Sequence, residues 1–193
     1  MTEQRRRFTA AELQSFRGKT LPDLIGPDTR LLFVGINPGL MTVAMQAHFG
    51  RRGNRFYPAL HAAGIVDHVI DASQGMKPED ETLLLAKGIG ITNLVPVATA
   101  RADELSRDEL TAGALRLAGI VQKVRPRVVA MLGVTAYRTA FAQPKAITGL
   151  QPERLAGAEL WVLPNPSGLN AHASLTDLGA AYRQAALAAE VVR

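Results

Sequence analysis

Asparagine–proline pairs stand in two glycine-containing turns, and they carry the polar side chains best suited to chemistry. The first turn, GINPGL, covers Gly35–Leu40 and directly follows an apolar run. Pro38 fixes its own φ angle and lacks an N–H, so Asn37 stands on a stiff turn. A carboxamide accepts and donates hydrogen bonds, and we therefore expect Asn37 to hold a water molecule or a ring atom of a ligand. An ordinary Asn-Pro-Gly turn is the alternative.

The second turn, NPSGLN, covers Asn165–Asn170 and also follows an apolar run. It presents Leu169 on a polar, glycine-containing loop. A single exposed leucine is common and usually has no function, but on a basic protein such a side chain has the shape of a wedge that enters a base stack. Neither turn has the spacing of a P-loop or of the G-x-G-x-x-G motif.

The composition excludes several kinds of site. The 193-residue sequence contains no cysteine, which rules out disulfides, thiol nucleophiles and thiolate metal sites. The spacing of its histidines matches no usual set of metal ligands; they are His48, His61, His68 and His172. We expect no structural metal.

The charge balance favours a polyanionic partner. Lys and Arg number 22 against 17 Asp and Glu, a net charge of +5, although many soluble proteins are as basic. Only 5% of the residues are aromatic, which argues against an extended surface for single strands. No apolar run reaches the roughly 18 residues of a membrane span, and no apolar stretch follows the basic N-terminus. We expect a cytoplasmic protein, associated with the nucleoid in a bacterium.

Strands and helices are predicted to alternate along the chain. Short apolar runs predict buried strands at residues 30–36, 89–95, 127–132 and 159–164. Helical spacing and capping residues predict helices at residues 10–16, 55–63, 78–87, 106–123, 134–141 and 175–191. This order predicts an α/β fold with one domain, a central four-stranded, mostly parallel sheet flanked by helices. Residues 1–29 are predicted as a basic N-terminal arm and residues 30–193 as the domain.

In such sheets ligands bind at the carboxyl ends of the strands, where both turns are expected to lie. Together with two further segments they carry a family resemblance. Four segments occur in this order: GINPGL from Gly35, GNRFY from Gly53, GIGITNLV from Gly88 and LPNPSGLN from Leu163. The sequence resembles the mismatch-specific uracil/thymine-DNA glycosylase family, the Mug and thymine-DNA glycosylase branch of the uracil-DNA glycosylase superfamily. The resemblance covers roughly residues 32–183.

The resemblance implies a fold and an activity. The fold is the uracil-DNA glycosylase one, a four-stranded parallel sheet with flanking helices. The activity is hydrolysis of the N-glycosidic bond of uracil, and sometimes of thymine or an alkylated base, opposite guanine in double-stranded DNA. This DNA repair reaction uses neither a metal nor an organic cofactor, and nothing in the sequence demands more than a monomer.

The resemblance also implies roles for individual residues. Asn37 matches the asparagine that holds the attacking water. Phe49 falls where an aromatic ring stacks on the flipped base, and Ile36 and Phe49 would offer main-chain groups to the edge of the pyrimidine. Asn165 stands where the classical uracil enzymes have a histidine, beside the base. Gly168, Leu169 and Asn170 match the segment that inserts into the duplex and contacts the widowed guanine.

Other polar residues near these segments have two interpretations each. Asn93 ends a predicted strand. In one interpretation it helps to position water or base in catalysis, and in the other it is a hydrogen-bonded strand-end residue. Arg51 and Arg52 are candidates for phosphate contacts; Arg55 is a further candidate or a helix-surface residue. His48 and His172 are interpreted either as a pocket-lining residue and a phosphate contact, respectively, or as ordinary surface histidines.

A general base is missing from the first turn, because a neutral amide removes protons poorly. Losing a base costs about 10²- to 10⁴-fold, so we expect a slow enzyme. Asp103 and Glu104 are the carboxylates nearest a strand end, although a solvated turn explains them as well. Two alternatives stay open: a non-catalytic module that binds mismatched or damaged DNA, and a hydrolase or transferase acting on free nucleosides. Leu169 and the arginines argue against free nucleosides.

Overall fold

The computed structural model describes residues 7–168 and 173–193. Its strands are β1 (Leu31–Gly35), β2 (Ile89–Asn93), β3 (Val128–Leu132), β4 (Gly149–Leu155) and β5 (Ala158–Leu163). Its helices are α1 (Ala10–Gln14), α2 (Leu40–Met45), α3 (Phe56–Ala62), α4 (Pro78–Ala86), α5 (Arg107–Val124), α6 (Val134–Ala140) and α7 (Leu175–Ala188), with a 3₁₀ turn at Ala102–Glu104.

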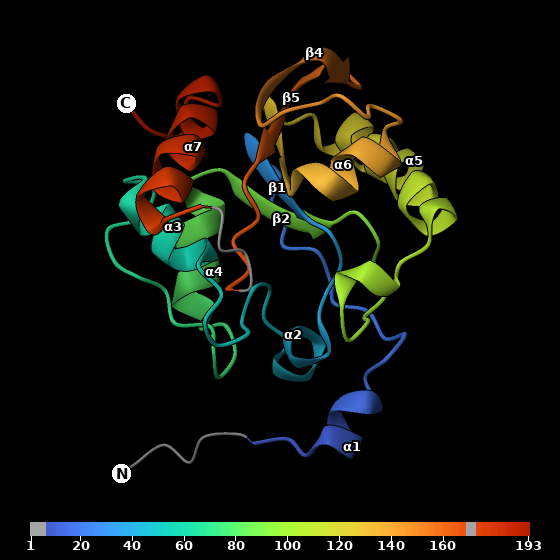
Figure 1. Ribbon diagram of the computed structural model, residues 1–193. Helices are drawn as coiled ribbons and strands as arrows, with labels where there is room; N and C mark the ends of the chain where they lie inside the picture. Colours follow the sequence, from blue (N-terminus) through green and yellow to red (C-terminus); the bar gives the residue numbers. More distant parts are fainter. Residues whose placement is uncertain (1–6, 169–172) are drawn as a thin grey trace.

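Within the described residues, five strands form one sheet in the order β2-β1-β3-β5-β4 (Figure 1). β1, β2, β3 and β5 run parallel, which confirms the predicted α/β fold with its four strands. β4 is an addition to that prediction: it pairs antiparallel with β5 at the edge of the sheet. Its residues are mostly exposed and include Pro152, so the sequence shows no apolar run there.

The sheet is covered on both faces. Alternate side chains of β1 point to opposite sides, as the pleat of a strand requires. Phe33 packs in a core with Leu60 of α3 and Tyr182 of α7, whereas Leu32 packs in a second core with Leu117 of α5. Figure 1 shows α3, α4 and α7 on one side of the sheet and α5 and α6 on the other. Burial on both faces explains why β1 and β3 are nearly continuous apolar runs, and β2 is likewise buried along its whole length.

In the described part of the predicted N-terminal arm, residues 7–29, the stretch around Leu24 lies against the outer edge of β2. Leu24 and Ile91 exchange main-chain hydrogen bonds of 2.9 and 2.7 Å. The Asp23 carboxylate accepts hydrogen bonds from Thr92 Oγ1 at 2.6 Å and from Arg116 at 3.2 Å. This segment therefore covers a strand edge that would otherwise expose unpaired main-chain groups.

The parallel strands all end at one edge of the sheet, which gathers the segments that follow them. These are residues 36–39 after β1, 94–102 after β2, Gly133 after β3 and 164–168 after β5. Ligands bind at this edge in open α/β sheets. No helix in the described parts of the chain is long and apolar enough to cross a bilayer.

Candidate active site

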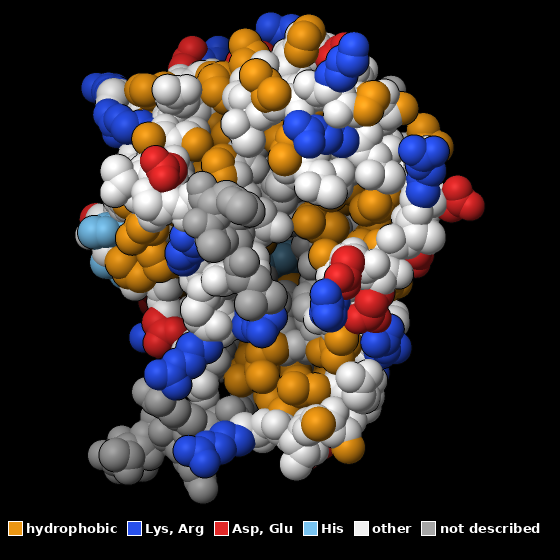
Figure 2. Space-filling model, viewed as in Figure 1, with side chains coloured by type: hydrophobic (Ala, Val, Ile, Leu, Met, Phe, Trp, Pro, Cys, Tyr) orange, Lys and Arg blue, Asp and Glu red, His pale blue; other side chains and the backbone are white. Residues whose placement is uncertain are grey.

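A cavity of about 360 Å³ opens at the carboxyl edge of the sheet. Figure 2 shows it as a hollow in one face of the molecule, with Lys and Arg side chains near its rim. The sequence-predicted residues that line it are Ile36, Asn37, Phe49, Arg51, Asn93 and Asn165. The fold thus brings together residues at the ends of β1, β2 and β5 with Phe49 and Arg51 of the loop between α2 and α3.

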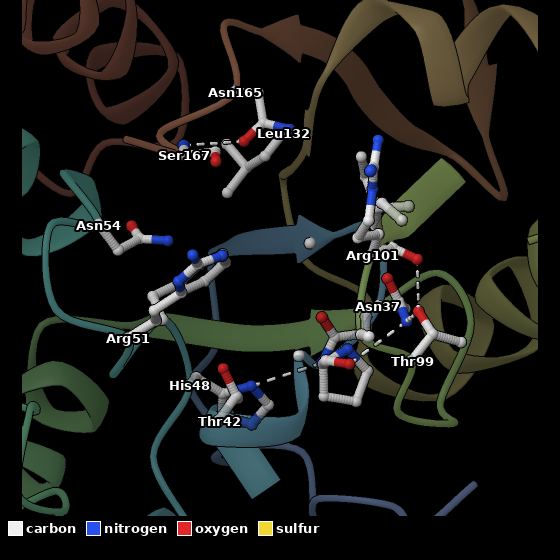
Figure 3. A pocket seen from close by; sticks show the side chains of 18 of the residues that line it. Asn37, Thr42, His48, Arg51, Asn54, Thr99, Arg101, Leu132, Asn165 and Ser167 are labelled. Carbon is white, nitrogen blue, oxygen red and sulfur yellow. Dashed lines mark hydrogen bonds between the residues drawn. The ribbon is translucent and has the colours of Figure 1, made fainter. Parts of the chain in front are cut away.

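The side-chain amide of Asn37 has a fixed orientation. Its Nδ2 donates to Thr99 Oγ1 at 2.7 Å (Figure 3). It also donates to the Val97 carbonyl at 3.1 Å and to the Pro38 carbonyl at 3.2 Å. Carbonyls only accept, and Thr99 Oγ1 already donates its proton to the Arg101 carbonyl at 2.7 Å. The atom bonded to these acceptors must therefore be nitrogen, which leaves Oδ1 to accept a hydrogen bond from a molecule in the cavity.

Phe49 presents a supported aromatic ring. It has a φ of 54°, in the left-handed region, and its ring stacks on Phe56 with centroids 4.0 Å apart. Phe56 is fully buried and meets Phe33 edge to face at 5.2 Å. The ring of Phe49 is thus held by the core, and it contributes to the cavity wall.

Gly35 lets Phe49 and Asn93 approach the end of β1. A Cβ at Gly35 would lie 2.6 Å from Asn93 Oδ1 and 3.2 Å from Cζ of Phe49. The first distance is shorter than any normal Cβ contact. A side chain at position 35 would therefore displace two groups that line the cavity, Phe49 and Asn93.

His48 is buried at 7% exposure and lines the cavity, so the interpretation as a surface histidine is wrong. Its Nε2 lies 2.9 Å from the Pro22 carbonyl, which can only accept, so Nε2 carries the proton. Burial lowers the pKa of His48 and favours the neutral ring. Nδ1 is then an acceptor, and Asn93 Nδ2 donates to it across 3.5 Å. Asn93 Oδ1 consequently faces Gly35 and the cavity.

Asn165 and Ile36 are partly engaged by main-chain groups. Asn165 Oδ1 accepts a hydrogen bond from Ser167 N at 2.9 Å, which shapes the turn after β5. The Ile36 carbonyl accepts one from Val95 N at 2.9 Å. Gly168 is exposed and packs closely on the main chain of Gly53. The predicted roles of Leu169, Asn170 and His172 fall outside the described residues.

The charged residues near the cavity differ in their surroundings. Arg51 and Arg52 are exposed, and Arg51 lines the cavity (Figure 3). Arg55 instead points inward and bonds main-chain carbonyls. Asp103 stands at the cavity wall with its carboxylate bonded to the Arg101 guanidinium at 2.5 and 3.0 Å. Glu104 pairs with Arg17 at 2.6 Å. Within residues 7–168 and 173–193, no cluster of three or more His, Asp or Glu side chains forms a metal site.

Comparison with known proteins identifies the family. The model of the uracil DNA glycosylase superfamily matches residues 22–189, most of the chain. The chain belongs to the uracil DNA glycosylase superfamily. A solution NMR structure of a candidate uracil DNA glycosylase from Methanosarcina acetivorans has a similar fold, with a TM-score of 0.57 and 21% sequence identity. The match covers 88% of this chain and 97% of that chain.

Membership of the uracil DNA glycosylase superfamily supports a hydrolase that releases a base from DNA, with DNA as its partner. For this superfamily member, sequence reasoning missed Thr99 and assigned no role to Arg101. Both lie in the segment after β2, and the same rule about strand ends that singled out Asn93 could have directed attention to them. The bond from Asn37 to Thr99 and the bond from Thr99 to the Arg101 carbonyl could not be inferred, because they depend on how that segment lies against the turn after β1.

Proposed function

We propose that this superfamily member is a mismatch-specific DNA glycosylase. It removes uracil, with thymine and modified pyrimidines as further candidate bases, from G·U and G·T mispairs in double-stranded DNA. The fixed carboxamide of Asn37 is the observation that carries the proposal. Its Nδ2 is committed to three acceptors, so its Oδ1 can hold the water that replaces the base at the sugar and leaves an abasic site.

The target nucleotide must first leave the helix, at a cost of a few kcal/mol. The cavity offers a place for the base, since the ring of Phe49 is already seated on Phe56. A mispaired base costs less to extrude than a paired one, which favours mismatches as substrates. Leu169, with Gly168 and Asn170, is proposed to fill the vacated space in the duplex.

Recognition of the pyrimidine edge is assigned to groups on the cavity floor. Asn93 Oδ1 can accept a hydrogen bond from the N3–H of uracil, because its amide nitrogen is directed to His48. Main-chain groups of Ile36 and Phe49, with Asn165, are proposed to contact the rest of the edge. In this proposal Asn93 contributes to catalysis by orienting the base rather than the water.

Catalysis then depends on orientation more than on proton removal. Cleavage builds positive charge on the sugar and negative charge on the base, which fixed dipoles around the cavity can stabilise. Asp103 is bonded to Arg101 rather than to Asn37, so we propose no general base and a slow rate. No cofactor is proposed. Arg51 and Arg52 would contact phosphates, and the protein would act as a monomer.

The test is single-turnover release of uracil from a duplex with one G·U pair. Asn37→Ala should slow release by about 10²- to 10⁴-fold, the usual cost of losing a group that handles the attacking water. Asp103→Asn is the matched control and should stay within about threefold of the wild type, because the Asp103 carboxylate forms an exposed ion pair with Arg101. An equal loss in Asp103→Asn would identify Asp103 as a base and contradict the proposal that no general base acts, whereas an unchanged rate in Asn37→Ala would reject the assignment to Asn37.

Parallel substrates separate the competing functions. Faster release from G·U than from A·U and from single strands supports the mismatch-specific enzyme. Binding of the G·U duplex by a wild type that releases no base would reject the enzyme and favour a damage-binding module. Release from free nucleosides alone would favour a nucleoside hydrolase.

A further inference from the structure

The guanidinium of Arg55 bonds to both sides of the turn after β5. Its Nη1 donates to the Ala173 carbonyl at 2.5 Å, and its Nη2 donates to the Ser167 carbonyl at 3.1 Å. The main-chain N–H of Arg55 also donates to the Pro166 carbonyl at 2.9 Å. The two residues whose carbonyls the side chain binds, Ser167 and Ala173, flank residues 168–172 in the sequence. A single half-buried arginine thus connects the points where this segment begins and ends.

A close main-chain contact reinforces the connection. A Cβ on Gly168 would lie 2.6 Å from the Gly53 carbonyl oxygen, so the two backbones touch. Phe49, Arg51 and Asn54, which precede Arg55, line the cavity, and so do Asn165 and Ser167 of the turn after β5. Arg55 therefore joins the wall that carries Phe49 to the turn that carries Gly168.

We infer that Arg55 is a positioning residue, which sets the separation and direction of the two ends of residues 168–172 before DNA binds. The inference rests on the proposed function, in which that segment inserts into the duplex. An arginine suits the task because its planar fork presents two terminal nitrogens in a rigid arrangement. A lysine ammonium is a single compact group on a flexible stem and does not hold two carbonyls at a set separation.

This role differs from a phosphate contact. A phosphate ligand contributes to binding in a salt-dependent manner, whatever the state of the target base. A group that orders the ends of an inserting segment in the free protein lowers the entropic cost of ordering them later. It therefore assists the step in which the duplex is opened. Arg55 should therefore influence extrusion of the base more than affinity for DNA.

Hydrogen exchange in the free protein tests the clamp without reference to activity. Arg55→Lys and Arg55→Met should raise amide exchange by about tenfold or more in the peptide covering residues 166–174, with little change in β1 and β3. Arg52→Met removes a neighbouring exposed charge and should leave exchange in that peptide unchanged. Uniformly faster exchange throughout the chain in both Arg55 variants would indicate a general structural role and overturn the inference.

Base extrusion is tested with 2-aminopurine placed next to the uracil of a G·U duplex. The Arg55 variants should slow the fluorescence rise and the release of uracil together, by about 10- to 100-fold, as expected for a misplaced positioning group. Release from single-stranded uracil DNA should change by less than about threefold, because no duplex is opened there.

Arg52→Met should show the opposite pattern, with weaker binding to DNA at low salt and a smaller dependence of that binding on salt, as expected for a lost phosphate contact. If Arg55→Met behaves like Arg52→Met, Arg55 is a phosphate contact and the inference is rejected. If the wild type releases no uracil, the proposed function fails, while the exchange experiment still decides whether Arg55 clamps the segment.

Discussion

At the scale of single residues, the site is controlled by groups that fix the orientation of two asparagine amides. Asn37 is oriented by Thr99 and by two carbonyls, and Asn93 by His48. Each amide is left with its oxygen as the atom that faces a ligand. Chemistry at the cavity therefore depends on residues that need not touch the substrate.

Thr99→Val tests this dependence. Valine keeps the shape of threonine but cannot accept the hydrogen bond from Asn37 Nδ2, so the amide loses its nearest partner. We expect single-turnover release of uracil to fall by about 10- to 100-fold, consistent with one lost buried hydrogen bond and a misplaced water. Thr111→Val on the exposed face of α5 is the matched control, since Thr111 Oγ1 bonds only within its own helix. Equal rates for the two variants would show that Thr99 is dispensable.

His48 predicts a dependence of stability on pH. Burial lowers its pKa in the folded protein, so the unfolded chain binds a proton on this ring more readily. The contribution of neutral His48 to the free energy of unfolding is then fully present above the unfolded pKa of about 6.5. It is lost as the pH falls below that value, by at most about 1.4 kcal/mol per pH unit for one proton. His68 acts in the opposite direction, because Asp67 and Asp80 raise its pKa.

Comparison with His48→Gln isolates the effect of His48, since glutamine keeps a donor for the Pro22 carbonyl and does not titrate. Between pH 7 and pH 5, the free energy of unfolding of the wild type should fall more steeply than that of the variant. Denaturant unfolding at each pH measures the difference. Parallel curves would mean that His48 accepts its proton while folded.

At the scale of elements, close packing brings the segment after β2 into position. A Cβ on Gly113 of α5 would lie 2.7 Å from the Leu94 carbonyl oxygen, directly after Asn93. Gly119 on the same helix has nothing within 4 Å of such a Cβ. Gly113 thus lets α5 pack closely against the segment after β2, whereas Gly119 makes no close contact.

Gly113→Ala and Gly119→Ala form a matched pair. Gly113→Ala should push α5 from the sheet, lower the melting temperature by several degrees and slow uracil release by displacing Asn93, since overpacking costs about 1–3 kcal/mol. Gly119→Ala should raise the melting temperature slightly, because alanine favours a helix by about 1 kcal/mol over glycine. Calorimetry and single-turnover assays measure both. A Gly113→Ala protein as stable as the wild type would contradict the packing argument.

The elements recognised from sequence are those with strong local signals. β1, β2 and β3 are buried along their whole length and β5 is buried at alternate positions, and their apolar runs predicted them. The capping box of Ser106 and Glu109 correctly located the start of α5. α2 was not predicted because five of its six residues are buried and leave no polar face. Asn37 was singled out by its motif and Phe49 by the family resemblance, whereas the burial of His48 follows from contacts with Pro22 and Asn93 that lie far away in sequence.

At the scale of the whole molecule, the net charge of +5 predicts salt-sensitive binding to DNA. Arg51→Gln and Arg52→Gln should each reduce the slope of log K against log salt by about 0.9, the value for one lost phosphate contact. Arg154→Gln is the control, because Arg154 pairs with Glu159 at the start of β5, the edge of the sheet opposite the cavity. Titrations at several salt concentrations measure the slopes. Equal slopes for all proteins would exclude Arg51 and Arg52 from the interface.

The aromatic side chains behind the cavity have a consequence for the bound state as a whole. Phe33 meets Phe56, and Phe56 meets Phe49, in a row that runs from the middle of the sheet to the cavity wall. A pyrimidine seated on Phe49 would become the outermost ring of that row. The substrate base would leave the interior of the double helix and complete the interior of the protein, so that the two macromolecules share one hydrophobic core while the bond is broken.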